Sequence, residues 1–223
     1  MGKRFRLASD GIPFVAAAGI ILIALGFAAS ITGNGFLWGL TYTEALLLIF
    51  IVFFFRDPDR IIPNGDNLVL SVGDGKVVVI KEVNFPELSE ENFIQVSVFL
   101  SVFNVHVNRV PVSGTIHEVK YFPGKFLAAW NEKASLDNEQ SLISVDTGGK
   151  RIYFKQIAGL IARRIVYDLK PGQTVEAGDR FGLIRFGSRV DILLPLDAEI
   201  SVKLGDAVKG GETVIGVLNN EAD

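Results

Sequence analysis

Two long apolar segments near the N-terminus constrain the fold of this chain more than any other feature. Residues 12–29 contain no charged side chain, and residues 36–55 contain one, Glu44. A helix needs about 20 apolar residues to cross a bilayer, and each segment approaches that length. The first is longer than a signal-peptide core, and the second follows at once. We therefore expect a retained anchor of two transmembrane helices, at about residues 12–31 and 36–55.

Glu44 leaves two arrangements of the second segment open. A carboxylate at the centre of a membrane helix costs about 2.5–3.5 kcal/mol, whereas each surrounding Leu, Ile, Val or Phe contributes about 0.3–0.6 kcal/mol. The sum favours complete insertion. Alternatively, the helix starts near Glu44 at the interface and leaves a short hairpin that enters the membrane only in part.

Basic residues predict the orientation of the anchor. They flank the two segments on the outside: Lys3, Arg4, Arg6, Arg56 and Arg60. The loop between the segments, residues 32–35, has neither Lys nor Arg. Because basic ends stay in the cytoplasm, we expect an anchor in the cell (inner) membrane, with the C-terminal domain on the cytoplasmic side.

The composition narrows the classes of function. The net charge is −3, so nucleic acid is not an expected partner. The absence of cysteine excludes disulfides and thiolate metal sites, and with two histidines we expect no metal site. The length after the anchor suits one domain. We expect a membrane anchor at residues 1–59 and a catalytic, β-rich domain at 60–223.

Short β-rich runs separated by turn residues follow the anchor. Because they are short and β-rich, and residues 96–101 also alternate in the manner of a strand, these runs predict strands: residues 68–72, 76–83, 93–103, 115–122 and 151–157. Residues 158–167 favour one short helix. The fold class predicted is therefore mainly β (α+β), preceded by the two N-terminal helices.

An internal repeat indicates the kind of β fold. Residues 169–179 and 202–212 share the pattern Lys-x-Gly-(Gln/Asp)-x-Val-x-x-Gly-(Asp/Glu), 33 positions apart. Each copy predicts two glycine turns around a short strand. Such copies resemble the hammerhead hairpins of biotin and lipoyl carrier domains, so we expect a barrel-sandwich-like β domain.

The pair Gly187-Ser188 lies between the two copies of the repeat. Strand-like runs at residues 181–186 and 190–194 flank it. On spacing alone, a Gly-Ser pair between two strands predicts a hairpin turn.

Three motifs change that interpretation. Behind the anchor the chain has, in order, Gly73-Asp74-Gly75, then Asn104-Val-His106-x-x-Arg109-x-Pro, then Phe186-Gly187-Ser188-Arg189. Together they resemble the short (type A) form of the pyruvoyl-dependent phosphatidylserine decarboxylases. The resemblance extends from about residue 53 to residue 217.

The resemblance implies a proenzyme that cuts itself by serinolysis at Gly187-Ser188. The products would be a large subunit of residues 1–187 and a small subunit of residues 188–223. Ser188 would become a covalent pyruvoyl cofactor, which forms a Schiff base with the substrate amine and accepts electrons as CO₂ leaves. The implied reaction converts phosphatidylserine to phosphatidylethanolamine in phospholipid biosynthesis. A membrane phospholipid is the implied substrate, and a homodimer of processed units is compatible with the family.

The resemblance also implies roles for His106 and Asp74, and guanidinium chemistry suggests a role for Arg109. A serine hydroxyl is a weak nucleophile without a base, and the implied arrangement is Asp74–His106–Ser188, with the division of roles between the first two left open. Arg109 is either a contact for a substrate phosphate or carboxylate, which a guanidinium binds with two hydrogen bonds, or a structural partner. His117 matches no motif, and we expect it to be structural.

Two alternatives remain open from the sequence. The first is the same chemistry on archaetidylserine. The second is a non-catalytic, membrane-anchored adaptor domain of the hammerhead type, which explains the repeat without a role for Ser188. A serine hydrolase is disfavoured because the chain has no Gly-x-Ser-x-Gly elbow.

Overall fold

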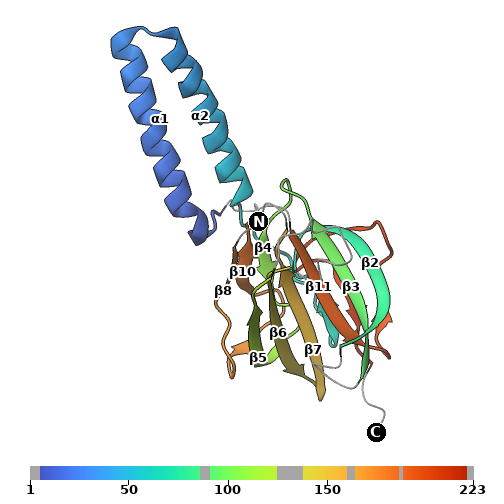
Figure 1. The fold of residues 1–223 in the computed structure, drawn as a ribbon. Helices are drawn as coiled ribbons and strands as arrows, with labels where there is room; N and C mark the ends of the chain where they lie inside the picture. The colour runs from blue at the N-terminus through green and yellow to red at the C-terminus, as the bar shows by residue number, and fades with distance from the viewer. Residues whose placement is uncertain (1–5, 86–90, 125–137, 160–163, 186–187, 220–223) are drawn as a thin grey trace. The chain divides into compact units, whose positions relative to one another are not determined.

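The computed structural model describes residues 6–85, 91–124, 138–159, 164–185 and 188–219. The chain divides into two compact units, Met1–Asp59 and Arg60–Asp223. The two N-terminal helices lie in the first unit and the β domain forms the second (Figure 1). The prediction of a mainly β fold behind two apolar helices is confirmed.

The first unit is a helical hairpin. After a 3-10 turn at Ser9–Gly11, α1 spans Ile12–Thr32 and α2 spans Gly35–Phe54. Gly33 ends α1 in the left-handed region (φ 62°), and the Asn34 side chain caps α2 by accepting from the Phe36 amide at 2.8 Å. Both helices are long and apolar enough to cross a membrane. Glu44 lies inside α2 rather than at its start, so the alternative of a helix that begins near Glu44 is wrong.

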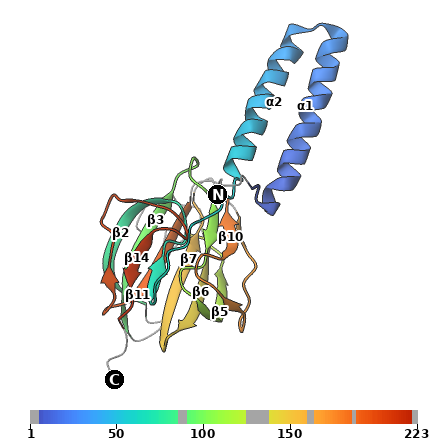
Figure 2. The same ribbon diagram turned by 180° about the vertical axis from the view of Figure 1, so that it is seen from behind.

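The second unit consists of antiparallel strands in three sheets, as far as the structure describes them. The strands are β1 Leu68–Leu70, β2 Gly75–Asn84, β3 Asn92–Leu100, β4 Val107–Arg109, β5 Gly114–Phe122, β6 Gln140–Thr147, β7 Lys150–Ile157, β8 Ile165–Tyr167, β9 Thr174–Val175, β10 Arg180–Ile184, β11 Ser188–Pro195, β12 Glu199–Ile200, β13 Ala207–Val208 and β14 Val214–Val217. The large sheet has the order β13-β2-β3-β11-β7-β6-β5-β9, and the small ones are β4-β10-β8 and β1-β14-β12. Figures 1 and 2 show the large sheet curving from β2 to β5.

The predicted strands are confirmed, but the predicted helix at 158–167 is wrong. Ile165–Tyr167 forms β8, which pairs with β10. Pairing with a strand distant in sequence overrides the local pattern in this segment. The middle of the predicted helix, residues 160–163, lies outside the described residues.

The two copies of the sequence repeat occupy equivalent places at the two edges of the large sheet. β9 pairs with β5 at one edge, and β13 pairs with β2 at the other. The Gly172 amide donates to the Ile116 carbonyl in one half, and the Gly205 amide donates to the Val77 carbonyl in the other, both at 2.8 Å. Both glycines have positive φ, 83° and 94°, which glycine adopts without strain. The repeat is therefore a two-fold pseudo-symmetry of the domain.

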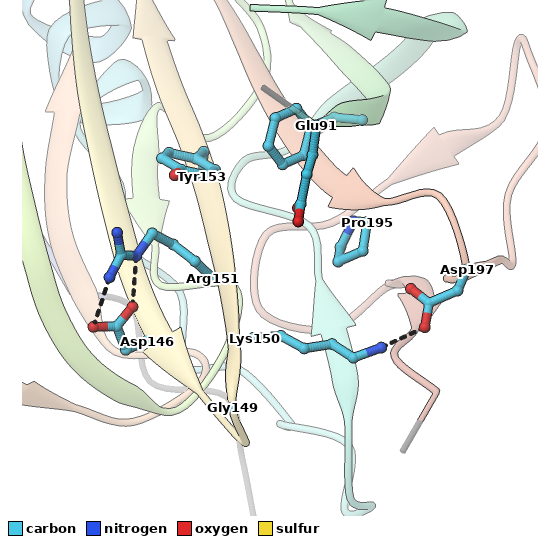
Figure 3. Close-up of a pocket in the computed structure, with 9 residues that line it drawn as sticks. Glu91, Asp146, Gly149, Lys150, Arg151, Tyr153, Pro195 and Asp197 are labelled. Carbon is cyan, nitrogen blue, oxygen red and sulfur yellow. Dashed lines mark hydrogen bonds and ion pairs between the residues drawn. The ribbon is translucent and has the colours of Figure 1, made fainter. Parts of the chain in front are cut away.

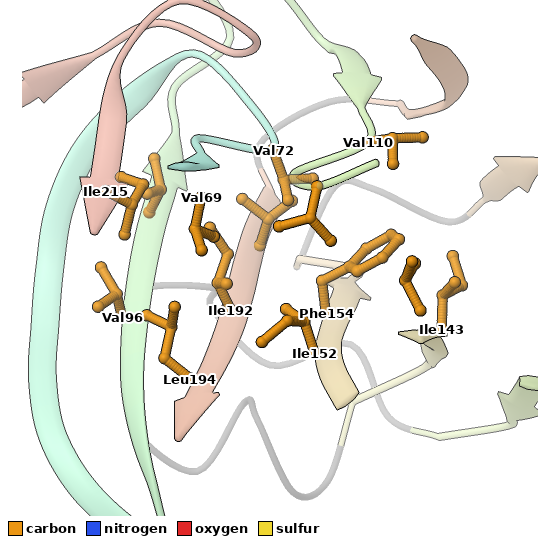
Figure 4. Packing of buried hydrophobic residues seen from close by; sticks show 14 of the residues in the cluster. Val69, Val72, Val96, Val110, Ile143, Ile152, Phe154, Ile192, Leu194 and Ile215 are labelled. Carbon is orange, nitrogen blue, oxygen red and sulfur yellow. The ribbon is translucent and has the colours of Figure 1, made fainter. Parts of the chain in front are cut away.

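The hydrophobic core fills the side of the large sheet that faces β1 and β14. Alternation along each strand places every second side chain on this face. In Figure 4, Val96, Ile192 and Phe154 from the large sheet gather with Val69 and Val72. All five side chains are buried. This packing fixes the direction in which neighbouring residues of β11 point.

Candidate active site

Ser188 is the first residue of β11 and points into the core side of the large sheet. It lies opposite Leu100 of β3 and on the same face as Val190 and Ile192. Its side chain is fully buried, and its hydroxyl has no hydrogen-bond partner among the described residues. A buried hydroxyl without a partner costs about 1–3 kcal/mol, so Ser188 is held at a position that stability alone does not favour.

The strands on either side of Gly187-Ser188 belong to different sheets. β10 pairs with β4 and β8, whereas β11 pairs with β3 and β7. The hairpin turn expected from spacing alone is therefore wrong, because a hairpin would pair β10 with β11. Gly187 itself lies outside the described residues. The peptide bond before Ser188 is thus in a connection between two sheets.

Asp74 lies in the turn between β1 and β2, at the Ser188 end of β3. Its Oδ1 accepts one hydrogen bond from Arg60 Nη2 and one from the Gly210 amide, both at 2.8 Å. The preceding residue, Gly73, packs against Leu100, because a Cβ added there would lie 3.0 Å from Leu100 Cδ2. Since Leu100 is the partner of Ser188 in the sheet, the Asp74 turn and Ser188 share a neighbour.

His106 is buried just before β4 and has a defined tautomer. A turn closed by the hydrogen bond from the Asn104 amide to the Ser101 carbonyl leads the chain back from the end of β3. Nδ1 of His106 lies 3.0 Å from the Asn104 carbonyl oxygen. A carbonyl only accepts, so Nδ1 carries the proton, and Nε2 is the basic nitrogen of the neutral ring.

The three expected catalytic residues do not form a continuous hydrogen-bonded relay in the uncut chain. The described partners of Asp74 are Arg60 and Gly210, and the Ser188 hydroxyl bonds to neither Asp74 nor His106. Catalytic hydrogen bonds are often long before the reacting groups are engaged. The structure therefore brings the residues to one end of β3 without joining them.

Arg109 contacts the two repeats and not the Ser188 hydroxyl. Its Nη1 donates to the Gly178 carbonyl at 3.0 Å. A Cβ added at Gly211, the counterpart of Gly178 in the second copy, would lie 2.8 Å from Arg109 Cδ. These contacts favour the structural alternative for Arg109, which joins the two glycine turns.

A row of hydrogen-bonded polar side chains crosses the core beside this site, and the sequence analysis did not predict it. Ser141 donates to Gln156 Oε1, and Gln156 Nε2 donates to Asn108 Oδ1, both at 2.8 Å. These bonds orient the Asn108 amide, whose buried Nδ2 donor has no partner among the described residues. A Cβ at Gly73 would lie 3.2 Å from that nitrogen. Amide residues carry no sequence signal that separates such a row from surface polar residues.

The opposite face of β11 carries a buried ion pair. Arg189 Nε donates to Asp191 Oδ1 at 2.6 Å, and Arg189 Nη2 donates to Ser97 of β3 at 2.7 Å. Arg189 and Asp191 are each 1% exposed. Through the contact with Ser97, the pair fixes the residues of β11 that directly follow Ser188 against β3.

A cavity of about 690 Å³ lies at the far end of β11, near Pro195 (Figure 3). Two ion pairs line it, Asp146–Arg151 and Lys150–Asp197. The hydrogen bond from Arg151 lowers the pKa of Asp146. No predicted site residue lines this cavity. Across the described part of the chain, no group of three or more His, Cys, Asp or Glu side chains is arranged to hold a metal ion.

Comparison with known proteins identifies similar chains over nearly the whole length. The sequence profile described as phosphatidylserine decarboxylase matches residues 47–216. The phosphatidylserine decarboxylase proenzyme of Wolbachia sp. subsp. Brugia malayi (strain TRS) is 46% identical over 215 residues, which cover 94% of each chain. That of Wolbachia pipientis wMel is 48% identical over 217 residues, 95% of this chain and 94% of the relative. That of Geotalea uraniireducens (strain Rf4) is 44% identical over 218 residues, 97% and 98% respectively.

Proposed function

Since the chain belongs to the phosphatidylserine decarboxylase family, we propose that it converts phosphatidylserine to phosphatidylethanolamine with a pyruvoyl group made from its own Ser188. It is a carboxy-lyase of that family, so the alternative of a non-catalytic adaptor domain is wrong. Phosphatidylserine is the substrate named for its relatives, and nothing in the described contacts favours archaetidylserine over it.

The buried hydroxyl of Ser188 carries the proposal. It lies at the start of a strand, lacks a hydrogen-bond partner among the described residues, and follows a connection between two sheets. A nucleophile that must attack the preceding carbonyl needs a hydroxyl not tied up elsewhere. It also needs a backbone that does not continue as a regular ladder through the reacting bond.

In this proposal, maturation is an intramolecular acyl shift followed by an elimination. The Ser188 oxygen bonds to the Gly187 carbonyl carbon, the peptide C–N bond breaks, and an ester replaces the amide. Loss of the Ser188 Cα proton then breaks the Cβ–Oγ bond and releases Gly187 as a carboxylate. Water hydrolyses the remaining dehydroalanine, and the nitrogen of residue 188 leaves as ammonia.

Two residues of this chain would move the protons. The basic Nε2 of His106 is suited to accept the hydroxyl proton. Asp74 would accept or direct a proton through the carboxylate oxygen that its two donors leave open. The pyruvoyl group supplies the electron sink that withdraws electrons from the substrate as CO₂ leaves.

The anchor would keep the enzyme at its substrate. We propose that both helices span the cell (inner) membrane and hold the β domain on the cytoplasmic side, as the basic flanks predict. A phospholipid could then reach the site without leaving the bilayer. A homodimer of processed units stays a prediction.

Replacing Ser188 tests the proposal. Ser188→Ala should remain one full-length chain without decarboxylase activity, because it has neither the attacking oxygen nor the leaving group. Wild type should give residues 1–187 and 188–223 on denaturing electrophoresis, with no free amine at the start of the smaller piece.

Ser144→Ala is the matched control. The Ser144 hydroxyl is also buried and without a partner among the described residues, in the same sheet. This variant should mature and turn over phosphatidylserine like wild type. A wild-type protein that is active yet uncut would refute the pyruvoyl mechanism.

A further inference from the structure

We propose that Arg60 is a positioning residue of the site, which acts by fixing the carboxylate of Asp74. The inference rests on the proposed function and extends it to a residue outside the three motifs. Arg60 is the first residue of the β domain unit, directly after the anchor unit ends at Asp59.

The contact between Arg60 and Asp74 is a sheltered ion pair. Arg60 Nη2 lies 2.8 Å from Asp74 Oδ1, and the two side chains are 5% and 13% exposed. Water and salt therefore screen this pair less than a surface pair, and the charge on both partners strengthens the hydrogen bond.

Both described donors reach the same oxygen of the carboxylate. Arg60 and the Gly210 amide each donate to Oδ1, and Oδ2 accepts no hydrogen bond from the described residues. Two donors on one oxygen fix the plane and position of the group, while the second oxygen keeps its capacity to accept a proton. The two donors therefore fix the place at which Oδ2 could accept a proton, and a turn alone does not require the charged one.

The pseudo-symmetry shows what the turn itself requires. The positions equivalent to Asp74 and Gly210 in the other half are Ser113 and Ala177, counted from the matched pairs Val77 with Ile116 and Gly205 with Gly172. There, Ser113 Oγ accepts from the Ala177 amide at 2.9 Å. A hydroxyl is therefore sufficient to hold this turn, and the described contacts of Ser113 include no charged group. The carboxylate and its arginine are additions in the half that contains Ser188.

Packing holds Arg60 in place. The side chain of Ile62 lies against both glycine turns, since a Cβ added at Gly178 would overlap it and one at Gly211 would lie 3.4 Å from its Cδ1. The Ile61 amide donates to Glu212 Oε1 at 3.3 Å. The segment that leaves the anchor is thus bound across both repeats, and Arg60 enters the site from a fixed backbone.

The test compares the self-cleavage rates of full-length variants in membranes. Arg60→Met should slow cleavage by about 10- to 100-fold, the loss typical when a catalytic group is displaced from its support. Arg60→Lys should restore most of the rate, because it keeps the charge. Asp74→Ser should keep the turn, as Ser113 does, but should lose most of the cleavage. Its melting temperature should fall, because the sheltered Arg60 guanidinium is left without its counter-charge.

The double variant separates positioning from a general structural role. If Arg60 acts through Asp74, Arg60→Met added to Asp74→Ser should slow cleavage no further, because the group it positions is already gone. Arg151→Met, which breaks an exposed Arg–Asp pair in the same domain, should leave the rate unchanged.

The outcomes that overturn the inference differ from those that overturn the proposed function. Cleavage of Arg60→Met or of Asp74→Ser at the wild-type rate refutes the positioning role, as do multiplicative effects in the double variant. A wild-type chain that stays uncut in the same gels refutes the proposed function, and the positioning role falls with it.

Discussion

At the scale of single residues, the two histidines differ in burial and in the groups that they contact. His106 is 1% exposed, and its Nδ1 donates to a backbone carbonyl, which leaves Nε2 as the acceptor. His117 is 46% exposed and lies 3.3 Å from Asp146 on the surface of the sheet. A surface pair of this kind contributes about 0–1 kcal/mol. Of the two, His106 is therefore the histidine suited to be the base of the proposed mechanism.

Replacing each histidine tests this assignment. His106→Ala should slow maturation or decarboxylation by about 10²–10⁴-fold, the contribution of a positioned acid or base. His117→Ala should leave both rates close to wild type. Timed electrophoresis measures maturation, and release of CO₂ from phosphatidylserine measures turnover. Equal rates in the two variants would remove His106 from the mechanism.

At the scale of strands and helices, local patterns predicted the elements better than their partners. Short β-rich runs identified β2, β3, β5 and β7, and apolar length identified α1 and α2. The separation of β10 from β11 was not predictable, because pairing is decided by contacts with strands distant in sequence. For the same reason β8 was mistaken for part of a helix.

The site was predictable only where a motif existed. Ser188, His106 and Asp74 came from the family resemblance, and their roles remain proposals. Arg60 and Asn108 were found only from contacts in the folded structure. Arg60 donates to Asp74 Oδ1, and Asn108 accepts from Gln156 Nε2. No spacing rule links residue 60 to residue 74 or residue 108 to residue 156, so sequence reasoning had no signal for them.

The buried pair on β11 gives a prediction at the same scale. Asp191→Asn should destabilise the domain by about 3–5 kcal/mol, because it leaves the Arg189 guanidinium buried without its counter-charge. Asp197→Asn removes a pair whose carboxylate is 50% exposed and should cost no more than about 1 kcal/mol. Thermal unfolding in detergent, with both changes made in the uncut Ser188→Ala variant, measures both, and equal melting temperatures would contradict a structural role for the Arg189–Asp191 pair.

At the scale of the whole molecule, the two units differ in which of their apolar side chains are buried. Within the first unit, the small side chains Ala18 and Ala29 are buried, whereas large ones such as Ile23 and Phe27 are exposed. Close contact through small residues is typical of helices that pack in lipid. Within the second unit, the large apolar side chains form a common core instead.

Reporter fusions test the proposed orientation of the anchor. The reporter is an enzyme that is active only outside the cytoplasm. It should be inactive when it is fused after Asp223 and active when it is fused after Gly33, in the loop between the helices. The expected pattern follows from the basic residues that flank α1 and α2 and are lacking in that loop. Activity of the reporter fused after Asp223 would show that the anchor has the opposite orientation.

The central place of β11 in the large sheet has a consequence for reversibility. β11 lies between β3 and β7, so the piece that begins at residue 188 supplies a middle strand. In the uncut chain the peptide link keeps that strand at an effective concentration of about millimolar. The proposed cut removes the link, and reassembly then requires two separate molecules to meet. If the cut occurs as proposed, a mature protein that unfolds would not readily refold, and its lifetime would be set by the rate of unfolding and not by an equilibrium.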